Sequence, residues 1–121
     1  YKRVIEKYNT PQEGIDNWRN HLLSFGLGNF LGYDLPVGSR GKIPSSNTYN
    51  AKYPNNNWYA TATISNAIGQ GEVLLTPIQM ANFTAAIANR GWWVRPHIIK
   101  NVQDQDTIPS VFEIKNKTTI D

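Results

Sequence analysis

The first apolar residues of the chain recur with the spacing of an amphipathic helix. Tyr1, Val4, Ile5 and Tyr8 fall on one helical face, and charged residues occupy the other. This pattern predicts a helix over about residues 1–8. No capping residue precedes it, and we therefore expect these residues to continue a longer polypeptide.

A second helix is predicted over about residues 11–25. Thr10, Pro11 and Glu13 form a capping box with proline at the first helical position. Gly26 follows as a residue that commonly ends a helix. Between these signals the apolar positions keep a helical spacing, with Ile15, Trp18, Leu22 and Phe25 on one stripe.

A third helix is predicted over about residues 77–89, because Thr76, Pro77 and Gln79 repeat the same capping signal. Its large apolar face comprises Met80, Phe83 and Ile87. Gly91 ends it.

The remaining segments are less regular. Residues 26–57 are rich in glycine, proline and asparagine and predict a long irregular loop, and residues 58–65 predict a short extended segment. Residues 97–102 and 110–115 predict two strands of a C-terminal hairpin. The whole, residues 1–121, is predicted to be a helix-rich α+β fragment: about three helices, one long loop and a small β-hairpin.

Composition narrows the classes of function. The net charge of +3 is scattered over both signs, which favours a solvated surface and predicts no nucleic-acid partner. The chain has no cysteine, and its two histidines, His21 and His97, have no metal-ligand spacing, so no metal or cofactor is predicted. No apolar run reaches the roughly 18 residues of a membrane helix, and any membrane anchor is expected outside this chain.

A set of short motifs occurs in a specific order between Thr63 and Pro96. They are Ser65 before Gly69-Gln70-Gly71, then Thr76-Pro77-Ile78-Gln79, Ala88-Asn89-Arg90-Gly91 and Pro96-His97, with Gly32-Tyr33-Asp34-Leu35-Pro36 upstream. The ordered set resembles the transpeptidase domain of class B penicillin-binding proteins, in particular the elongation-type, penicillin-binding protein 2-like group. The resemblance spans about residues 1–100.

The resemblance implies a parent protein that is a serine D,D-transpeptidase of cell-wall synthesis. Such an enzyme attacks the D-Ala-D-Ala end of a peptidoglycan stem peptide, is acylated by β-lactams, and works at the periplasmic or extracytoplasmic face of the bacterial inner membrane. Its partners here would be the remainder of the transpeptidase domain. Apolar faces that would pack on that remainder also favour homo-oligomer contacts in the fragment.

The family's catalytic motifs are Ser-x-x-Lys at a helix start, Ser-x-Asn, and Lys-Thr-Gly on a strand. Three strings imitate them: Ser39-Arg40-Gly41-Lys42, Ser45-Ser46-Asn47 and Lys117-Thr118-Thr119. We interpret all three as coincidences, because the first lies in a Gly/Pro-rich loop and the third has threonine where glycine is needed. The chain is therefore interpreted as the insert between the second and third motifs, with no catalytic residue and no activity alone.

One segment is predicted to approach the substrate groove, because its glycines permit close backbone contact. It comprises Ser65, Asn66, Gly69, Gln70, Gly71 and Glu72. A structural turn beneath the groove is the alternative interpretation. A separate hypothesis is that the chain is a non-catalytic module that binds glycan or protein through surface aromatic residues such as Trp92 and Trp93.

Overall fold

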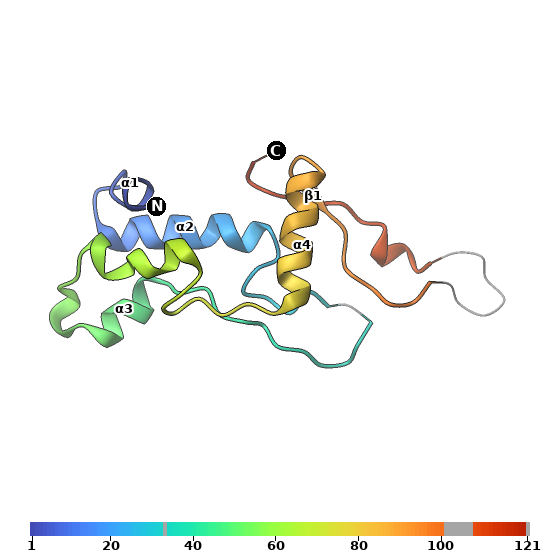
Figure 1. Ribbon diagram of the computed structural model, residues 1–121, viewed down its shortest axis with the longest axis horizontal. Coiled ribbons are helices and arrows are strands. Elements are labelled where there is room, and N and C mark those ends of the chain that lie inside the picture. The colour runs from blue at the N-terminus through green and yellow to red at the C-terminus, as the bar shows by residue number, and fades with distance from the viewer. Residues whose placement is uncertain (33, 101–107, 121) are drawn as a thin grey trace.

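The computed structural model describes residues 1–32, 34–100 and 108–120. Figure 1 shows an elongated molecule in which helix α2 (Pro11–Ser24) lies along the long axis and α4 (Pro77–Ala88) crosses its C-terminal end. The short α1 (Lys2–Ile5) lies against the start of α2. Helices α3 (Ser46–Lys52) and the 3-10 helices η1 (Pro54–Asn56) and η2 (Ala60–Ile68) complete the same end of the molecule.

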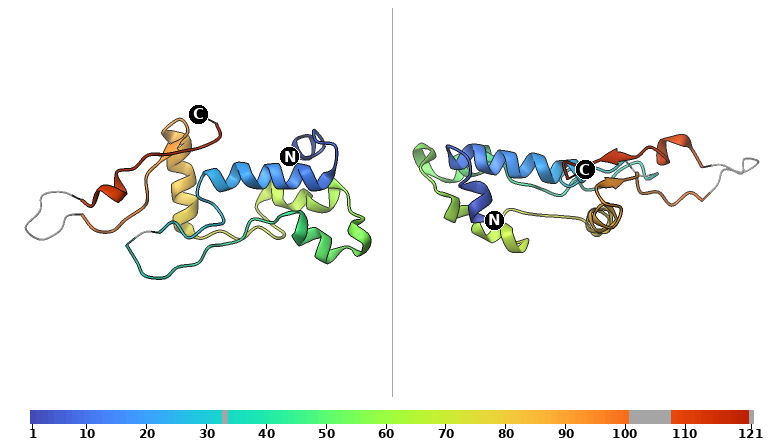
Figure 2. Two further views of the ribbon diagram at one scale, coloured as in Figure 1. Left: turned by 180° about the vertical axis from the view of Figure 1, so that it is seen from behind. Right: turned by 90° about the horizontal axis from the view of Figure 1, so that it is seen from above.

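The described residues also form a two-stranded antiparallel sheet of β1 (Trp92–Trp93) and β2 (Asn116–Lys117), with a 3-10 helix η3 (Ser110–Phe112) before β2. Seen from above in Figure 2, β1 and β2 lie beside α4, and the described residues after β1 and before β2 extend away from the helices. The predicted class, a helix-rich fragment with a small hairpin, is confirmed. No helix within the described residues is long and apolar enough to cross a membrane.

The two longer helices begin where their capping signals predict. The Thr10 hydroxyl accepts a hydrogen bond from the Glu13 amide at 3.2 Å. Thr76 and Gln79 form the full reciprocal box, at 3.3 and 2.9 Å. The first helix is shorter than the predicted residues 1–8, since it ends at Ile5.

The predicted strands at 97–102 and 110–115 are wrong in position over the described residues. The amides of Ile98 and Ile99 donate to the Asp34 carboxylate, so they are not available to a strand partner. Residues 110–112 form η3. The hairpin pairs Trp92 with Lys117 and Trp93 with Asn116 instead. Positions 101 and 102 lie outside the described residues.

Two further segments differ from their predictions. Residues 60–68 form η2 rather than an extended segment, and Ala60, Thr63 and Asn66 are buried at the three-residue spacing of a 3-10 helix. The predicted loop 26–57 contains α3 and η1. Helix α3 is held by Asp16 of α2, whose carboxylate accepts hydrogen bonds from the amide and hydroxyl of Ser46, 30 positions away.

The apolar core is divided into two clusters. The first gathers α1, α2, α3 and η2 and consists of Ile5, Ile15, Tyr49, Trp58 and Ala60. The second lies where α2 meets α4 and consists of Phe25, Leu27, Ile43 and Ala86. Trp18 packs against both clusters and so connects the two ends of the molecule.

Candidate functional site

The predicted groove segment is a tight reversal at the end of η2. Gly69 (φ 70°) and Gly71 (φ 71°) both adopt the left-handed conformation that favours glycine. The amide of Gly69 donates to the carbonyl of Asn66 at 3.1 Å, and that of Gln70 to the carbonyl of Ser65 at 3.0 Å. These bonds fold the Gly69-Gln70-Gly71 loop back onto its own helix and fix its backbone.

The two glycines have different surroundings. A Cβ atom at Gly71 would clash with the hydroxyl of Ser65, so this position requires glycine for space as well as for backbone conformation. A Cβ atom at Gly69 would have no heavy atom within 4 Å. Gly69 and Gln70 are exposed. The loop therefore has one packed side and one open side.

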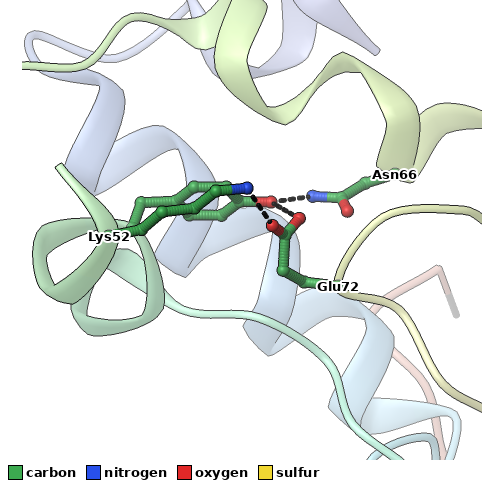
Figure 3. Close-up of polar contacts among 4 residues, drawn as sticks. Lys52, Asn66 and Glu72 are labelled. Atoms are coloured by element: carbon green, nitrogen blue, oxygen red, sulfur yellow. Dashed lines mark hydrogen bonds and ion pairs between the residues drawn. The ribbon is translucent and has the colours of Figure 1, made fainter.

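A cluster of polar side chains anchors both ends of this loop (Figure 3). The Tyr49 hydroxyl of α3 donates to Glu72 Oε2 at 2.9 Å and accepts from Asn66 Nδ2 at 2.8 Å. Lys52, one turn after Tyr49, binds Glu72 Oε1 at 2.9 Å. The loop ends are therefore connected to each other through α3.

The electrostatics of the cluster follow from burial and charge. Burial raises the pKa of the Tyr49 phenol, and the neighbouring Glu72 carboxylate raises it further, so Tyr49 is a hydrogen-bond donor at neutral pH. Burial also acts to raise the pKa of Glu72, but the hydrogen bonds from Lys52 and Tyr49 outweigh it and hold that pKa below its ordinary value. The hydrogen bond to Glu72 raises the pKa of Lys52. The cluster is thus an ion pair joined to a neutral phenol.

Asn66 is the most deeply buried polar group of the predicted segment, with 5% of its surface exposed. Its Nδ2 atom donates to the hydroxyls of Tyr1 at 3.2 Å and of Tyr49. Its Oδ1 atom is buried and has no hydrogen-bond partner among the described residues. A buried acceptor left unpaired is costly and marks a position where a further donor would stabilise the structure.

All six predicted groove residues lie in this one reversal. Ser65 and Asn66 belong to η2, Gly69, Gln70 and Gly71 form the turn, and the half-buried Glu72 follows it. Their contact with a substrate stays a prediction. Sequence reasoning missed Tyr1, Tyr49 and Lys52. The local signals were the capping box of Ser45 and Thr48 and the helical spacing of Tyr49 and Lys52, and nothing in them indicated Glu72, 20 positions after Lys52.

The three imitations of catalytic motifs have structural roles. In the third, Lys117 pairs with Trp92 in the sheet and the Thr118 amide donates to the Gly91 carbonyl at 2.7 Å. Ser39 lies outside any helix, and its hydroxyl accepts the amide of Gly41 at 3.2 Å. Lys42 pairs through its backbone with Leu74, at 2.6 and 2.9 Å. Ser46 binds Asp16. None of these serines lies at a helix start one turn before a lysine, the arrangement that serine activation in this chemistry requires.

The aromatic residues that a binding platform would use are largely packed inside the molecule. Trp58 is 4% exposed, and its indole nitrogen donates to Asn50 at 2.9 Å. Trp93 packs against the second cluster and donates to the Ser24 carbonyl at 2.9 Å. Trp92 lies beneath the ammonium group of Lys115, which is 4.3 Å from the ring centroid. Within the described residues, no group of three or more His, Cys, Asp and Glu side chains could hold a metal ion.

Residues 4–120 match the model of the penicillin binding protein transpeptidase domain. The chain is similar to the peptidoglycan D,D-transpeptidase MrdA of Acinetobacter baumannii, with 38% identity over 74% of this chain and 13% of the relative. It is also similar to MrdA of Salmonella typhimurium, with 36% identity over 78% of this chain and 15% of the relative. The chain therefore spans about a seventh of these relatives.

A solved structure supports the same assignment. The fold matches a crystal structure of Pseudomonas aeruginosa PBP2 in complex with WCK 5153, with a TM-score of 0.65 and 29% sequence identity. The match covers 91% of this chain and 24% of that one. The likeness therefore extends over nearly all of residues 1–121 but over only a part of the solved relative.

Proposed function

The chain belongs to the penicillin binding protein transpeptidase domain family, and on that basis we propose that it is part of a D,D-transpeptidase of peptidoglycan synthesis. Two findings support this proposal. Residues 4–120 match the model of this domain, and the chain is similar to relatives that are peptidoglycan D,D-transpeptidases. The complete protein would attack a D-Ala-D-Ala stem peptide with a serine and form an acyl-enzyme. It would then transfer the acyl group to an amine of a neighbouring strand. β-Lactams would acylate the same serine.

We propose that residues 1–121 carry no catalytic group and are inactive alone. Acylation needs a serine activated by a lysine one helical turn away. Ser39 is the residue whose sequence context imitates this arrangement, but Ser39 and Lys42 lie in an irregular segment, so no helical turn holds the hydroxyl and the ammonium group together. The contribution of these residues would be one wall of the domain.

Within that wall, we propose that the open side of the Gly69-Gln70-Gly71 loop faces the substrate groove. Three features support this role. The backbone is fixed by its bonds to η2, the packed side is anchored through Glu72 to α3, and Gly69 and Gln70 remain exposed. A fixed, exposed loop in which glycines flank one polar side chain suits close contact with a peptide substrate. The complete enzyme would act at the extracytoplasmic face of the bacterial inner membrane.

The test is acylation of the complete protein by a fluorescent penicillin, followed by digestion and mass spectrometry. We expect a single adduct on a serine outside residues 1–121 and no adduct on the isolated chain. The Ser39→Ala variant should be acylated as fast as the wild type. A stoichiometric adduct on Ser39 would contradict the proposal.

The loop is tested in the same assay. Gln70→Ala should slow acylation roughly fivefold, because it would remove one hydrogen bond of about 1 kcal/mol between the Gln70 side chain and the substrate. Thr61→Ala, at an exposed position near the start of η2, should leave the rate unchanged. Equal rates for the two variants would favour a structural turn remote from the groove.

A further inference from the structure

The two ends of the Gly69-Gln70-Gly71 loop are held in different ways. At the end nearest η2, the loop amides donate to the carbonyls of residues 65 and 66. At the other end, the backbone of residues 71–73 makes no hydrogen bond to another backbone group of the described residues, and the next such bond is at Leu74. The side chain of Glu72 is therefore the polar group that fixes this second end.

The Glu72 carboxylate is bound from α3 by two donors. The Tyr49 hydroxyl donates to Oε2 at 2.9 Å, and the Lys52 ammonium group binds Oε1 at 2.9 Å. The Lys52 side chain is 56% exposed, and exposed ion pairs contribute little. Tyr49 is fully buried in the first core cluster, so its hydroxyl is the donor that holds a fixed position.

The Tyr49 hydroxyl also holds the first end of the loop, because it accepts a hydrogen bond from Asn66 Nδ2 at 2.8 Å. Asn66 precedes the loop and Glu72 follows it, so one phenolic oxygen binds both ends (Figure 3). Gln70 lies between these two points and is exposed. The place of its side chain relative to the core therefore depends on the two hydrogen bonds of Tyr49.

We propose that Tyr49 and Glu72 are positioning residues for acylation, which act by holding Gln70 at the substrate groove. This inference rests on the proposed function, in which the open side of the loop faces that groove. The hydroxyl and the carboxylate are engaged with each other, and Tyr49 is buried, so contact with the substrate is left to Gln70. A small displacement of a substrate-contacting group is enough to slow a reaction, because catalysis depends on its geometry.

The test is a double-mutant cycle on the acylation of the complete protein by a fluorescent penicillin. Glu72→Ala and Tyr49→Phe are each measured alone and together with Gln70→Ala, with rates normalised to the protein that is finally acylated. Glu72→Gln is the conservative variant, since its amide oxygen can still accept the hydrogen bond of the Tyr49 hydroxyl. Ile15→Val is the control, because it removes a buried methyl group from the same core cluster and leaves the polar contacts in place.

We expect Glu72→Ala and Tyr49→Phe each to slow acylation by roughly three- to fivefold, close to the effect expected for Gln70→Ala. Added to Gln70→Ala, neither should slow the reaction further, because the contact through which they act is already lost. Glu72→Gln should recover most of the rate, and Ile15→Val should react like the wild type. If Glu72→Ala does not fold, Tyr49→Phe, which keeps the buried ring, decides the matter.

An unchanged rate in either variant would overturn the inference. Slowing that multiplies with that of Gln70→Ala would also overturn it, because these residues would then act by a route other than the loop. Equal slowing by Ile15→Val, or no recovery in Glu72→Gln, would show a general effect of destabilisation instead. If Gln70→Ala is slow and Glu72→Ala and Tyr49→Phe are not, the positioning inference fails and the proposed function stands. If the complete protein is not acylated at all, the proposed function fails and the inference fails with it.

Discussion

Glu72 accepts a hydrogen bond from the Tyr49 hydroxyl, and this contact joins the segment after the Gly69-Gln70-Gly71 loop to a helix 23 positions earlier. Tyr49 is fully buried and lies in the first core cluster. Its ring packs tilted against Trp58, with a centroid separation of 5.1 Å. The Tyr49 hydroxyl therefore links the polar cluster at both ends of the loop to the core.

Tyr49→Phe is expected to lower the free energy of unfolding by about 2 kcal/mol, because it removes a donor to Glu72 and an acceptor for Asn66 while keeping the ring. Urea unfolding of the complete protein measures this. Tyr59→Phe is the matched control, since Tyr59 is 71% exposed, and should change the free energy by less than about 0.5 kcal/mol. Similar effects of the two variants would show that the hydroxyl of Tyr49 contributes nothing to stability.

The Glu72 carboxylate should give the protein an acid-sensitive component of stability. The folded-state pKa of Glu72 is lowered from 4.5, so its contribution is present above that value and is lost as the pH falls through the folded-state pKa. Glu72→Gln should therefore be less stable than the wild type by about 1.5–3 kcal/mol at neutral pH, the value of a hydrogen bond to a charged group. The two proteins should converge in acid.

The measurement is the free energy of urea unfolding across the acid range. Glu6→Gln is the control, because Glu6 forms an exposed pair with Lys2 at 3.7 Å, and exposed pairs contribute little. A constant difference between wild type and Glu72→Gln at every pH would mean that ionisation of Glu72 does not stabilise the fold.

The sequence was sufficient to predict the elements whose signals are local. Helices α2 and α4 begin directly after Thr10 and Thr76 because each cap is completed within three residues. The strands could not be placed in this way. Their position depends on Asp34 binding the amide of Ile98, 64 positions away, and on Trp93 binding Ser24, 69 positions away. The alternating apolar residues at 110–115 gave no indication of these two contacts.

The same distinction between local and long-range contacts explains which residues of the site could be predicted from the sequence. Ser65, Asn66 and Glu72 could be grouped from the sequence because they surround one glycine turn. The residues that hold them, Tyr49 and Lys52, come from a segment that was predicted as irregular. That segment has a local cap, in which Thr48 Oγ1 accepts the Ser45 amide at 3.1 Å, but its place beside α2 depends on the contact with Asp16, which local propensity does not contain.

The two glycines of the loop should respond differently to alanine. Gly69→Ala is expected to cost about 1 kcal/mol, because only the left-handed backbone opposes it. Gly71→Ala should cost roughly 1–3 kcal/mol more, since its Cβ atom would also overlap the Ser65 hydroxyl. Thermal and urea unfolding measure both costs. Adding Ser65→Gly to Gly71→Ala should recover most of the extra cost. If Ser65→Gly restores no stability, the extra cost of Gly71→Ala does not come from overlap with the Ser65 hydroxyl.

Among the described glutamines, Gln79 is expected to contribute most to the stability of the fold. It is 1% exposed, and its Nε2 atom donates to the carbonyls of Asn29 at 2.9 Å and Arg40 at 2.8 Å. Its Oε1 atom accepts the amide of Thr76 at 2.9 Å. The side chain thus closes the cap of α4 and holds two points of the segment between α2 and α3.

Gln79→Ala leaves these three backbone groups unpaired and is expected to destabilise the protein by about 2–4 kcal/mol. Gln79→Glu keeps the acceptor but loses both donations, so it should be similarly destabilised. Gln70→Ala removes the same side chain from an exposed position and should change the free energy of unfolding by less than about 0.5 kcal/mol. Urea unfolding of the three variants decides the matter. If Gln79→Ala is as stable as Gln70→Ala, the segment at Asn29 and Arg40 is held by other contacts.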